Sequence, residues 1–436
     1  MLAAGMITEY NPLHRGHLRL AEAVRRELGD GAALIACMSG DFVQRGDFAV
    51  ARRQARAKAA VMGGVDLVME LPLPWCLSSA EGFAEGGVSL LLATGCVDAI
   101  AFGSERGDID ALQEAAGVLL REDFPAVLRE ELSTGVPFPV ARQRAVRRLA
   151  GPAVADVLSR PNDILGAEYC KALLRRNSGV RPLAIRREGA PHNPDAIPDS
   201  PDYPDTLPDS YILPDTQENA FPSSGEIRAF LRRGERAAAL SRMAPSMRSC
   251  YLEEEAAGRA PVFYGTVERA ILWRLRSMSR ADFAAFDEGR EGLCNRLYEA
   301  SRNAASVREI LERAKTKRYP MSRLRRMTLR AALGAEIRAY RPAYLRPLAM
   351  NAVGRKLLSR MRTCAALPIL TKAADVRELG PDAQALLDLE ARAADLYALA
   401  YPEPTALSGG AVWKESPWIA DDASAPNPAS FGKELP

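Results

Sequence analysis

The chain has 436 residues, 47% of them hydrophobic and 26% charged, and a length of this kind predicts two or three domains. Its formal net charge of +3 is too small to indicate a nucleic-acid partner without a look at how the charges are distributed. It has no run of about 20 apolar residues, no signal-peptide pattern, and no Cys or His cluster of zinc-ligand spacing, so we expect a cytoplasmic protein with reduced cysteines, no metal-ligand residues and no membrane partner.

Short apolar runs alternate with helical patterns over positions 1–190. The helical patterns are Leu18–Leu28, Arg52–Met62 and Ala80–Ala93. Alternation of this kind is typical of βαβ units, so we expect a Rossmann-like α/β domain with a parallel sheet covered by helices on both faces. In such sheets ligands bind beyond the carboxyl ends of the strands. The runs that predict strands are Ala3–Glu9, Ala33–Met38, Asp66–Leu71, Asp98–Gly103 and Pro182–Arg187.

The rest of the chain divides by composition. Residues 191–222 are rich in Pro and Asp and contain no Lys or Arg, which predicts a flexible insertion. Residues 223–262 have a helical pattern and would complete the first domain. Residues 263–402 predict a basic, mainly α-helical C-terminal domain, and residues 403–436 predict a flexible tail.

Two histidines follow the first predicted strand. His14 and His17 are three residues apart where the first helix begins, with Gly16 between them and Asn11-Pro12 in the preceding turn. On the first turn of a helix such residues share one face with exposed N–H groups, and this arrangement suits a triphosphate. Histidine can donate hydrogen bonds to an α-phosphate under attack, so we assign both histidines as catalytic. No GxxxxGK[ST] or strand-linked GxGxxG motif offers another phosphate site.

Several further segments extend this HxGH signature. With them the chain resembles the bacterial tRNA(Met) cytidine acetate ligase family, within the superfamily of HxGH nucleotidyltransferases. The matches occur in order within positions 1–190, and the later ones are not shared with the wider superfamily. The matching segments are Glu9–His17, Met38–Gly46, Asp66–Pro72, Ser79–Glu81, Phe102–Glu105 and Pro161–Tyr169.

The resemblance implies a two-step reaction. Acetate would attack the α-phosphate of ATP to give acetyl-adenylate and pyrophosphate, and the acetyl group would pass to N4 of the wobble cytidine of elongator tRNA(Met). ATP, acetate and tRNA are therefore the expected partners, Mg²⁺ is expected because it accompanies ATP, and no obligate protein partner is evident. A displacement at phosphorus needs positioned phosphate contacts more than a covalent nucleophile, and no Ser/His/Asp or Cys/His arrangement is evident.

The ATP site would be built around the first strand and helix. The resemblance adds Gly103, Asn162 and Arg187, although Gly103 could be a plain turn glycine, Asn162 a helix cap, and Arg186 the matching arginine. From the first strand and turn the assigned residues are Ile7, Thr8, Glu9, Tyr10, Asn11, Pro12, Leu13, His14, Gly16, His17 and Leu18.

A second phosphate-binding element is expected at residues 223–228. Ser223, Ser224 and Arg228 resemble the Ser-Ser/Thr-x-Ile-Arg element of many HxGH enzymes. Hydroxyls at a helix N-terminus together with an arginine would hold phosphates opposite the histidines. The alternative is an N-capped surface helix.

The second substrate is assigned to the turn after the second strand. Asp41, Gln44 and Arg45 follow that strand and are candidates for the acetate or cytidine side, while a loop arginine is also commonly a solvated one. The chain departs from the family pattern at 52–54, where Arg-Arg-Gln replaces the expected acidic or aromatic stretch. The insertion at 191–222 is also longer than usual, and a longer loop loses little entropy.

A basic stretch within the predicted helical domain indicates an RNA partner. Residues 302–362 contain seventeen lysines and arginines against three glutamates, and Tyr319, Tyr340 and Tyr344 lie among them where bases could stack. A solvated helix face is the alternative. The preferred tRNA contacts are Lys317, Arg318, Arg323, Arg325 and Arg326.

Two other functions remain open from the sequence. A small-molecule adenylyltransferase would share the HxGH chemistry without needing a basic helical domain. A non-catalytic tRNA-binding protein would keep the basic domain and lose ATP binding.

Overall fold

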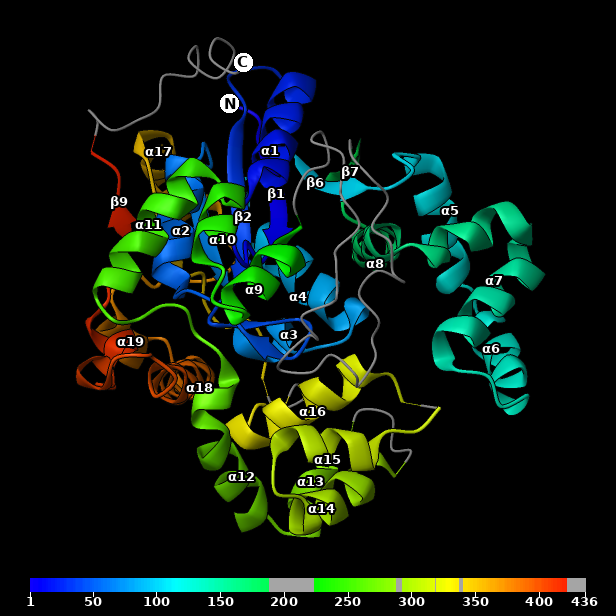
Figure 1. Cartoon of the computed structure of the whole chain (residues 1–436). Helices are drawn as coiled ribbons and strands as arrows, with labels where there is room; N and C mark the ends of the chain where they lie inside the picture. Colours follow the sequence, from blue (N-terminus) through cyan, green and yellow to red (C-terminus); the bar gives the residue numbers. More distant parts are fainter. Residues whose placement is uncertain (188–222, 288–291, 318, 337–339, 422–436) are drawn as a thin grey trace.

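The computed structural model describes residues 1–187, 223–287, 292–317, 319–336 and 340–421. Its centre is a seven-stranded sheet in the order β7-β6-β1-β2-β5-β8-β9 (Figure 1). These strands pair in parallel except for β5 with β8, so β8 and β9 run opposite to the other five. The strands are β1 (Ala3–Thr8), β2 (Ala33–Ser39), β5 (Leu67–Leu71), β6 (Ala99–Ser104), β7 (Arg181–Arg186), β8 (Pro347–Met350) and β9 (Trp418–Ile419).

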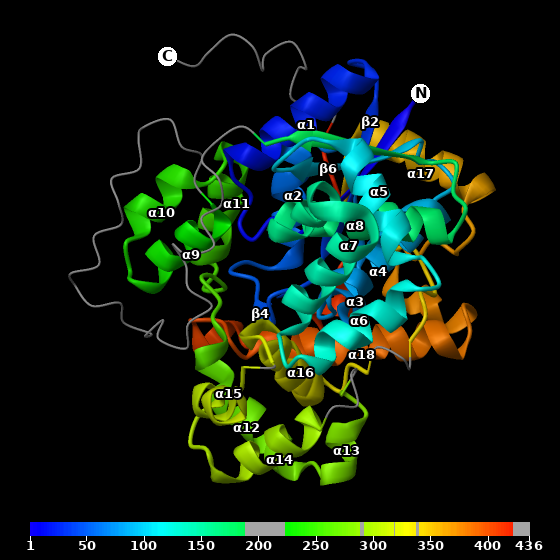
Figure 2. The same cartoon turned by 90° about the vertical axis from the view of Figure 1, so that its right-hand side faces the viewer.

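Helices cover both faces of this sheet because its central strands are apolar on both sides. Ile35 and Cys37 of β2 pack with α4 (Ala80–Ala93), α5 (Ile109–Leu119), α8 (Pro161–Arg175) and α17 (Ala352–Cys364). Leu34 and Ala36 pack on the other face, with helices from two distant parts of the chain (Figure 2). Those helices are α1 (Arg15–Leu28), α2 (Arg53–Met62), α9 (Ser224–Arg232), α10 (Arg236–Arg242) and α11 (Pro245–Ala256). The predicted Rossmann-like α/β fold is confirmed.

A separate group of helices lies below the sheet in Figure 1. They enclose their own core, which includes Leu297, Ile310 and Leu324. Phe42 and Phe48, from the short hairpin of β3 (Phe42–Val43) and β4 (Asp47–Phe48), also belong to this core. We call α12 (Glu268–Ser277), α13 (Arg280–Ala284), α14 (Leu293–Asn303), α15 (Val307–Ala314) and α16 (Met321–Leu333) the helical unit.

Further helices flank these two cores. α6 (Phe124–Ser133) and α7 (Phe138–Ala155) lie at the edge of the fold beside α5. α18 (Pro381–Ala398) joins the two cores, because Leu386 packs with the sheet and Leu389 packs with the helical unit. Among the described residues, no helix is both long enough and apolar enough to cross a membrane. The seven cysteines are free thiols.

The path of the second half differs from the expected division into a helical domain and a tail. Strand β8 comes from within the predicted helical segment, and β9 and α19 (Ala411–Lys414) come from within the predicted tail. The sequence pattern could not reveal β8, because four apolar residues beside arginines show neither strand nor helix periodicity. The sheet provides the backbone partners that make so short a strand stable. Residues 191–222 and 422–436 lie outside the described residues.

Candidate functional site

The histidine pair forms a capping arrangement at the N-terminus of α1. His14 is the N-cap residue, and its Nδ1 accepts a hydrogen bond from the N–H of Gly16 at 3.1 Å. In return the N–H of His14 donates to Nδ1 of His17 at 3.3 Å. An N-cap normally uses a Ser, Thr, Asp or Asn oxygen, so this sequence places imidazoles where a helix exposes its positive end.

The cap also fixes which ring nitrogen carries the hydrogen. Because Nδ1 accepts in both His14 and His17, the neutral rings carry their proton on Nε2. The two rings are 3.9 Å apart at their centroids, and the rings of Tyr10 and His17 are roughly perpendicular with their centroids 5.2 Å apart. The arrangement therefore presents two Nε2–H donors side by side.

Both imidazoles are held neutral. Burial lowers the pKa of His14 to about 4, and the positive charges of Arg187 and Arg228 contribute to this lowering. Burial is also the main cause that lowers the pKa of His17 well below its usual range, followed by His14 and Arg187. Neutral rings beside two guanidinium groups act as hydrogen-bond donors in an electropositive site, which suits a polyphosphate.

The segment at residues 223–228 lies against the histidine turn, as the second phosphate-binding element requires. Ser224 Oγ donates to the carbonyl of Pro12 at 3.1 Å, and Arg228 Nη1 donates to the carbonyl of Asn11 at 2.7 Å. Ser223 caps α9 by accepting from the N–H of Glu226 at 3.1 Å. Burial lowers the pKa of Arg228 to about 10. The N-termini of α1 and α9 therefore meet at one turn although they are far apart in the sequence.

Arg187 lies at the carboxyl end of the sheet beside Gly103. Gly103 pairs with Ile185 across β6 and β7, and a Cβ on Gly103 would lie 3.3 Å from Cγ of Arg187. Arg186 instead packs against Gly107, on the other side of that strand end. Arg187, which packs on Gly103, is also the arginine whose positive charge lowers the pKa of both histidines.

Asn162 is not the cap of α8. The N-cap residue is Arg160, and Asn162 lies in the first turn, where its Nδ2 donates to Glu105 Oε1 at 2.7 Å. The same carboxylate accepts from the N–H of Asp163 at 2.9 Å, so Glu105 satisfies the exposed end of this helix. The alternative interpretation of Asn162 as a helix cap is wrong, because a carboxylate from the neighbouring loop takes that role.

The remaining residues of the first strand and turn divide into packing and polar groups. Leu13 is buried, Leu18 is half-buried, and both pack in the core under α1. Ile7 packs toward Gly87 of α4. The buried Asn11 Nδ2 has no hydrogen-bond partner among the described residues.

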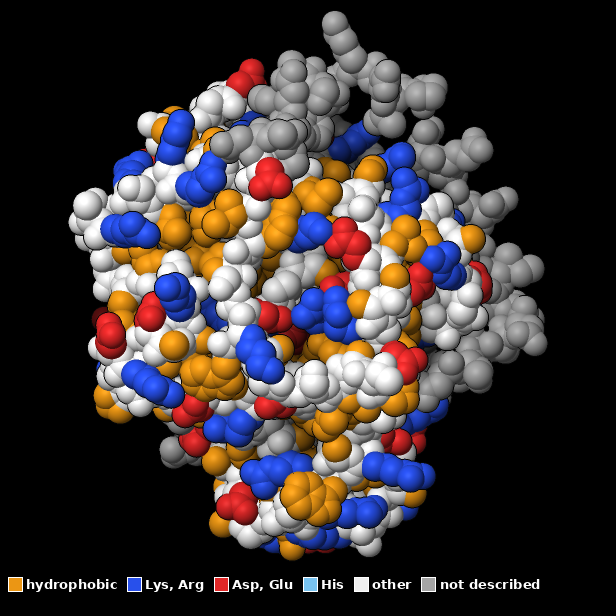
Figure 3. Space-filling model, turned by 90° about the vertical axis from the view of Figure 1, so that its left-hand side faces the viewer, with side chains coloured by type: hydrophobic (Ala, Val, Ile, Leu, Met, Phe, Trp, Pro, Cys, Tyr) orange, Lys and Arg blue, Asp and Glu red, His pale blue; other side chains and the backbone are white. Residues whose placement is uncertain are grey.

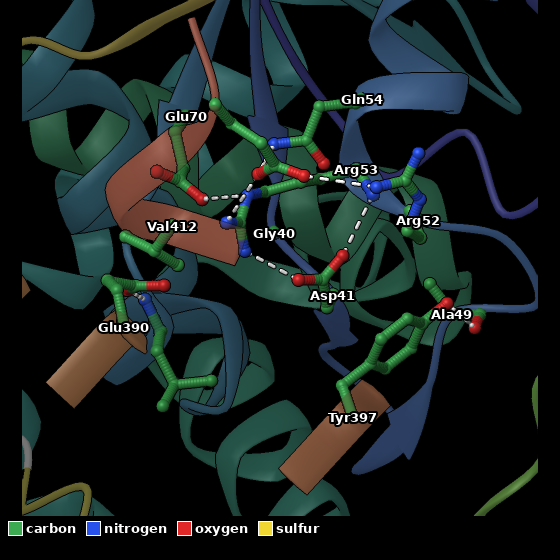
Figure 4. Close-up of polar contacts among 12 residues, drawn as sticks. Gly40, Asp41, Ala49, Arg52, Arg53, Gln54, Glu70, Glu390, Tyr397 and Val412 are labelled. Carbon is green, nitrogen blue, oxygen red and sulfur yellow. Dashed lines mark hydrogen bonds and ion pairs between the residues drawn. The ribbon is translucent and has the colours of Figure 1, made fainter. Parts of the chain in front are cut away.

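Asp41 and the unusual Arg52-Arg53-Gln54 segment form a buried ionic network (Figure 4). Both oxygens of Asp41 contact Arg53, which donates from its backbone N–H at 2.8 Å and from Nη1 at 2.5 Å. The guanidinium of Arg53 also pairs with Glu70 at 3.3 Å and with Glu415 at 3.3 Å. The departure from the family pattern is therefore an internal ion-pair network that engages both oxygens of Asp41.

Sequence reasoning missed the carboxylates of this network. Glu70 is a charged residue inside a fully buried strand, and this was the one available signal. Glu390 lies next to it, and burial, with the nearby Glu70 carboxylate, raises the pKa of Glu390 to about 8. Arg346 is a second arginine paired with Glu70, and its Nη1 lies 3.0 Å from Glu70 Oε2.

The predicted tRNA contacts lie on and before α16. Lys317 is exposed, Arg325 and Arg326 are half-buried, and Arg318 lies outside the described residues. Arg323 lies 3.5 Å from Asp287 and over the ring of Tyr319.

The expectation of stacking tyrosines is wrong for two of the three. Tyr319 and Tyr344 are 4% and 1% exposed, because they fill the two cores, and only Tyr340 is half-buried. On the face in Figure 3, Lys and Arg side chains are spread over the whole surface, the helical unit included, with Asp and Glu among them.

Comparison with known proteins identifies the family of this chain. The model of the HIGH Nucleotidyl Transferase family matches residues 1–203 and 209–409. A relative from Acetivibrio thermocellus is 33% identical over 94% of this chain and 98% of its own length, and one from Caldanaerobacter subterraneus subsp. tengcongensis is 34% identical over 92% and 96%. Both are named tRNA(Met) cytidine acetate ligase.

Solved structures agree. Thermotoga maritima TmcAL bound with alpha-thio ATP superposes with a TM-score of 0.84 at 32% identity, covering 96% of this chain and 99% of that one. Its apo form gives 0.86 at 31% identity with the same coverage. Because the family model and these relatives span nearly the whole length, the resemblance is confirmed, and the chain belongs to the HIGH nucleotidyl transferase family and, within it, to the tRNA(Met) cytidine acetate ligases.

Proposed function

We propose that this chain is an ATP-dependent ligase that acetylates N4 of the wobble cytidine of elongator tRNA(Met). The observation that carries the proposal is the pair of neutral imidazoles, His14 and His17, held with their Nε2–H groups at the start of α1 between Arg187 and Arg228. The names of the relatives, and the ATP analogue bound by the Thermotoga maritima protein, support the substrates.

The reaction has two displacements. An acetate oxygen attacks the α-phosphorus of ATP, the bond to the bridging oxygen breaks, and pyrophosphate leaves. The N4 amino group of cytidine then attacks the carbonyl carbon of acetyl-adenylate, AMP leaves with the bridging oxygen, and the nitrogen loses a proton to water. Neither step needs a covalent nucleophile from the protein, so its residues act by positioning and by stabilising charge.

Each part of the site has a role in the first displacement. His14 and His17 donate from Nε2 to the α-phosphate oxygens, where negative charge grows as the oxygen of acetate attacks. Arg187 and Arg228 stabilise the pyrophosphate that leaves, with the hydroxyls of Ser223 and Ser224 beside them. Gly103, Asn162, Glu9, Tyr10 and Gly16 complete the nucleotide site around the same strand ends.

Magnesium arrives with the phosphates of ATP. No group of three His, Cys, Asp or Glu side chains within the described ranges could hold a metal by itself. The phosphate oxygens and water would therefore supply most of the Mg²⁺ ligands, as is usual for nucleotide-bound magnesium.

The second substrates approach from the helical unit. Gln44 and Arg45 lie at the tip of the β3–β4 hairpin, between the nucleotide site and α16, and we assign them to the acetate or cytidine side. The basic residues Lys317, Arg325 and Arg326 would attract the tRNA backbone. A tRNA substrate fits a cytoplasmic protein.

Two partial reactions test the proposal. Acetate-dependent exchange between ATP and pyrophosphate measures adenylate formation, and labelled acetate entering tRNA measures transfer. His14→Ala and His17→Ala should each reduce exchange by about 100-fold or more, as loss of a transition-state donor does, with little change in tRNA affinity. Arg15→Ala is the matched control, because this exposed residue lies between them.

The same assays separate the alternatives. A small-molecule adenylyltransferase would bind ATP and put no label into RNA. A non-catalytic tRNA-binding protein would show no ATP binding by calorimetry and no effect of either histidine substitution. Either result, obtained with the wild-type chain, would overturn the proposed function.

A further inference from the structure

The hairpin after β2 is a compact structure with a defined turn. β3 and β4 are joined by three residues, and the N–H of Gly46 donates to the carbonyl of Val43 at 2.9 Å. Gly46 has a φ of +75°, in the left-handed region that a three-residue hairpin loop requires at its last position. Gln44 and Arg45 occupy the other two positions, so the turn fixes the direction of both.

One side of this hairpin is bound to the nucleotide site. The N–H of Gln44 donates to Glu9 Oε1 at 2.6 Å, and Glu9 directly follows β1. Asp47 pairs with Arg232 of α9 at 2.9 Å. Movement of the hairpin is thereby tied to the end of β1 and to the helix that carries Arg228.

The other side is bound to the helical unit. A Cβ on Gly46 would lie 2.6 Å from the backbone nitrogen of Arg326 and 2.8 Å from the carbonyl carbon of Arg325. The glycine therefore packs directly on the backbone of α16, at the two arginines assigned to tRNA. Phe42 and Phe48 anchor the hairpin in the same core as Leu324 and Met327 of α16.

We infer that the β3–β4 hairpin is the positioning element of the transfer step, and that Gly46 is the positioning residue that sets its distance from α16. The hairpin connects the element that holds ATP to the helix that faces the RNA. It thereby fixes where a cytidine held by the helical unit lies relative to the acetyl-adenylate. This inference rests on the proposed function. It goes beyond that function by assigning a role in transfer to a residue that contributes only its backbone.

Gly46→Ala tests it, because the added methyl group must push the hairpin and α16 apart. A misplacement of about 1 Å can reduce a rate by up to 100-fold, so we expect the kcat of acetyl transfer to fall by at least about tenfold. Acetate-dependent ATP–pyrophosphate exchange and the KM for tRNA should stay within about twofold of wild type.

Gly334→Ala is the matched control. Gly334 ends α16 with a φ of +72°, and a Cβ there would meet no described atom within 4 Å beyond its own helix and chain neighbours. Alanine there creates a similar backbone strain at the end of α16, without the steric contact between the hairpin and α16. Equal transfer rates in the two variants would overturn the inference, and so would a loss of exchange in Gly46→Ala with intact exchange in Gly334→Ala.

A second variant keeps the inference testable should Gly46→Ala fold poorly. Asp47→Ala removes the partly exposed pair with Arg232, which contributes little to stability, and loosens the hairpin at its other end. Transfer should fall about threefold more than exchange, because the charge of Asp47 also acts on Arg228 of the nucleotide site. An unchanged ratio of transfer to exchange would refute the role of the hairpin. A wild-type chain without exchange or RNA labelling would instead refute the proposed function, so the two failures are distinguishable.

Discussion

Replacing Glu390 by glutamine should make the fold more stable at neutral and alkaline pH. Glu390 is 3% exposed and lies near Glu70, and its side chain accepts from the backbone N–H of Leu73. Glutamine has the shape of the protonated acid and keeps a carbonyl oxygen for that hydrogen bond. It removes only the carboxyl group that would become a buried charge.

The magnitude follows from the pKa. Burial, reinforced by Glu70, raises the pKa of Glu390 from 4.5 to about 8. Between these values the unfolded chain releases a proton that the folded chain keeps, so the free energy of unfolding falls as pH rises from 4.5 through 8. At about 1.4 kcal/mol per pKa unit, the full loss is roughly 5 kcal/mol as an upper limit, and about 3 kcal/mol of it falls between pH 5 and pH 7.

Urea unfolding at several pH values measures the difference between Glu390→Gln and the wild type. The stability advantage of the variant should grow from pH 5 toward pH 8 and level off above it. Asp388→Asn is the control, because Asp388 is exposed on the same helix. A difference that does not change with pH would refute the view that Glu390 stays protonated in the folded protein.

Three further outcomes are expected. Gly103→Val should displace Arg187 and weaken ATP binding in calorimetry by about tenfold. Combining it with Arg187→Ala should weaken binding little further, and additive losses would contradict a shared contact. Asp41→Ala leaves the buried Arg53 without its nearest partner, so urea unfolding should show a loss of about 3–5 kcal/mol, and a loss under about 1 kcal/mol would argue against the network. In the ligand-free protein, NMR should show His14 titrating near pH 4. As pH falls from 6.5 toward 4 the unfolded chain binds a proton on His14 that the folded chain does not, so the free energy of unfolding falls. A midpoint above 6 would exclude a neutral donor.

The histidine turn could be predicted from the sequence because its geometry is local. His14, Gly16 and His17 lie close together in the chain, and the capping hydrogen bonds among them need no distant partner. The alternation of strands and helices over positions 1–190 is equally local, since each element follows from its own periodicity. For this reason the amino-acid pattern was enough to predict the fold class and to single out the histidine pair.

The partners of that turn were decided by tertiary structure. That Arg228 donates to Asn11, and that the charge of Arg187 acts on both histidines, depends on how separate elements pack. The local sequence carries no information about such contacts. A family motif indicated the residues at 223–228, and only the packing of α9 against the histidine turn explains their position.

The second half of the chain shows the same limit most clearly. β8 is too short to have a periodicity of its own, and it forms because β5 offers an open edge. Glu415 looks like one more tail carboxylate until the fold brings it to Arg53, where burial without a partner would be unfavourable. The sequence by itself determined which segments of the first domain are helical or extended and where the histidine motif begins. The tertiary structure alone decided which charges are buried together, because the energy of a buried charge depends on neighbours that are distant in the chain.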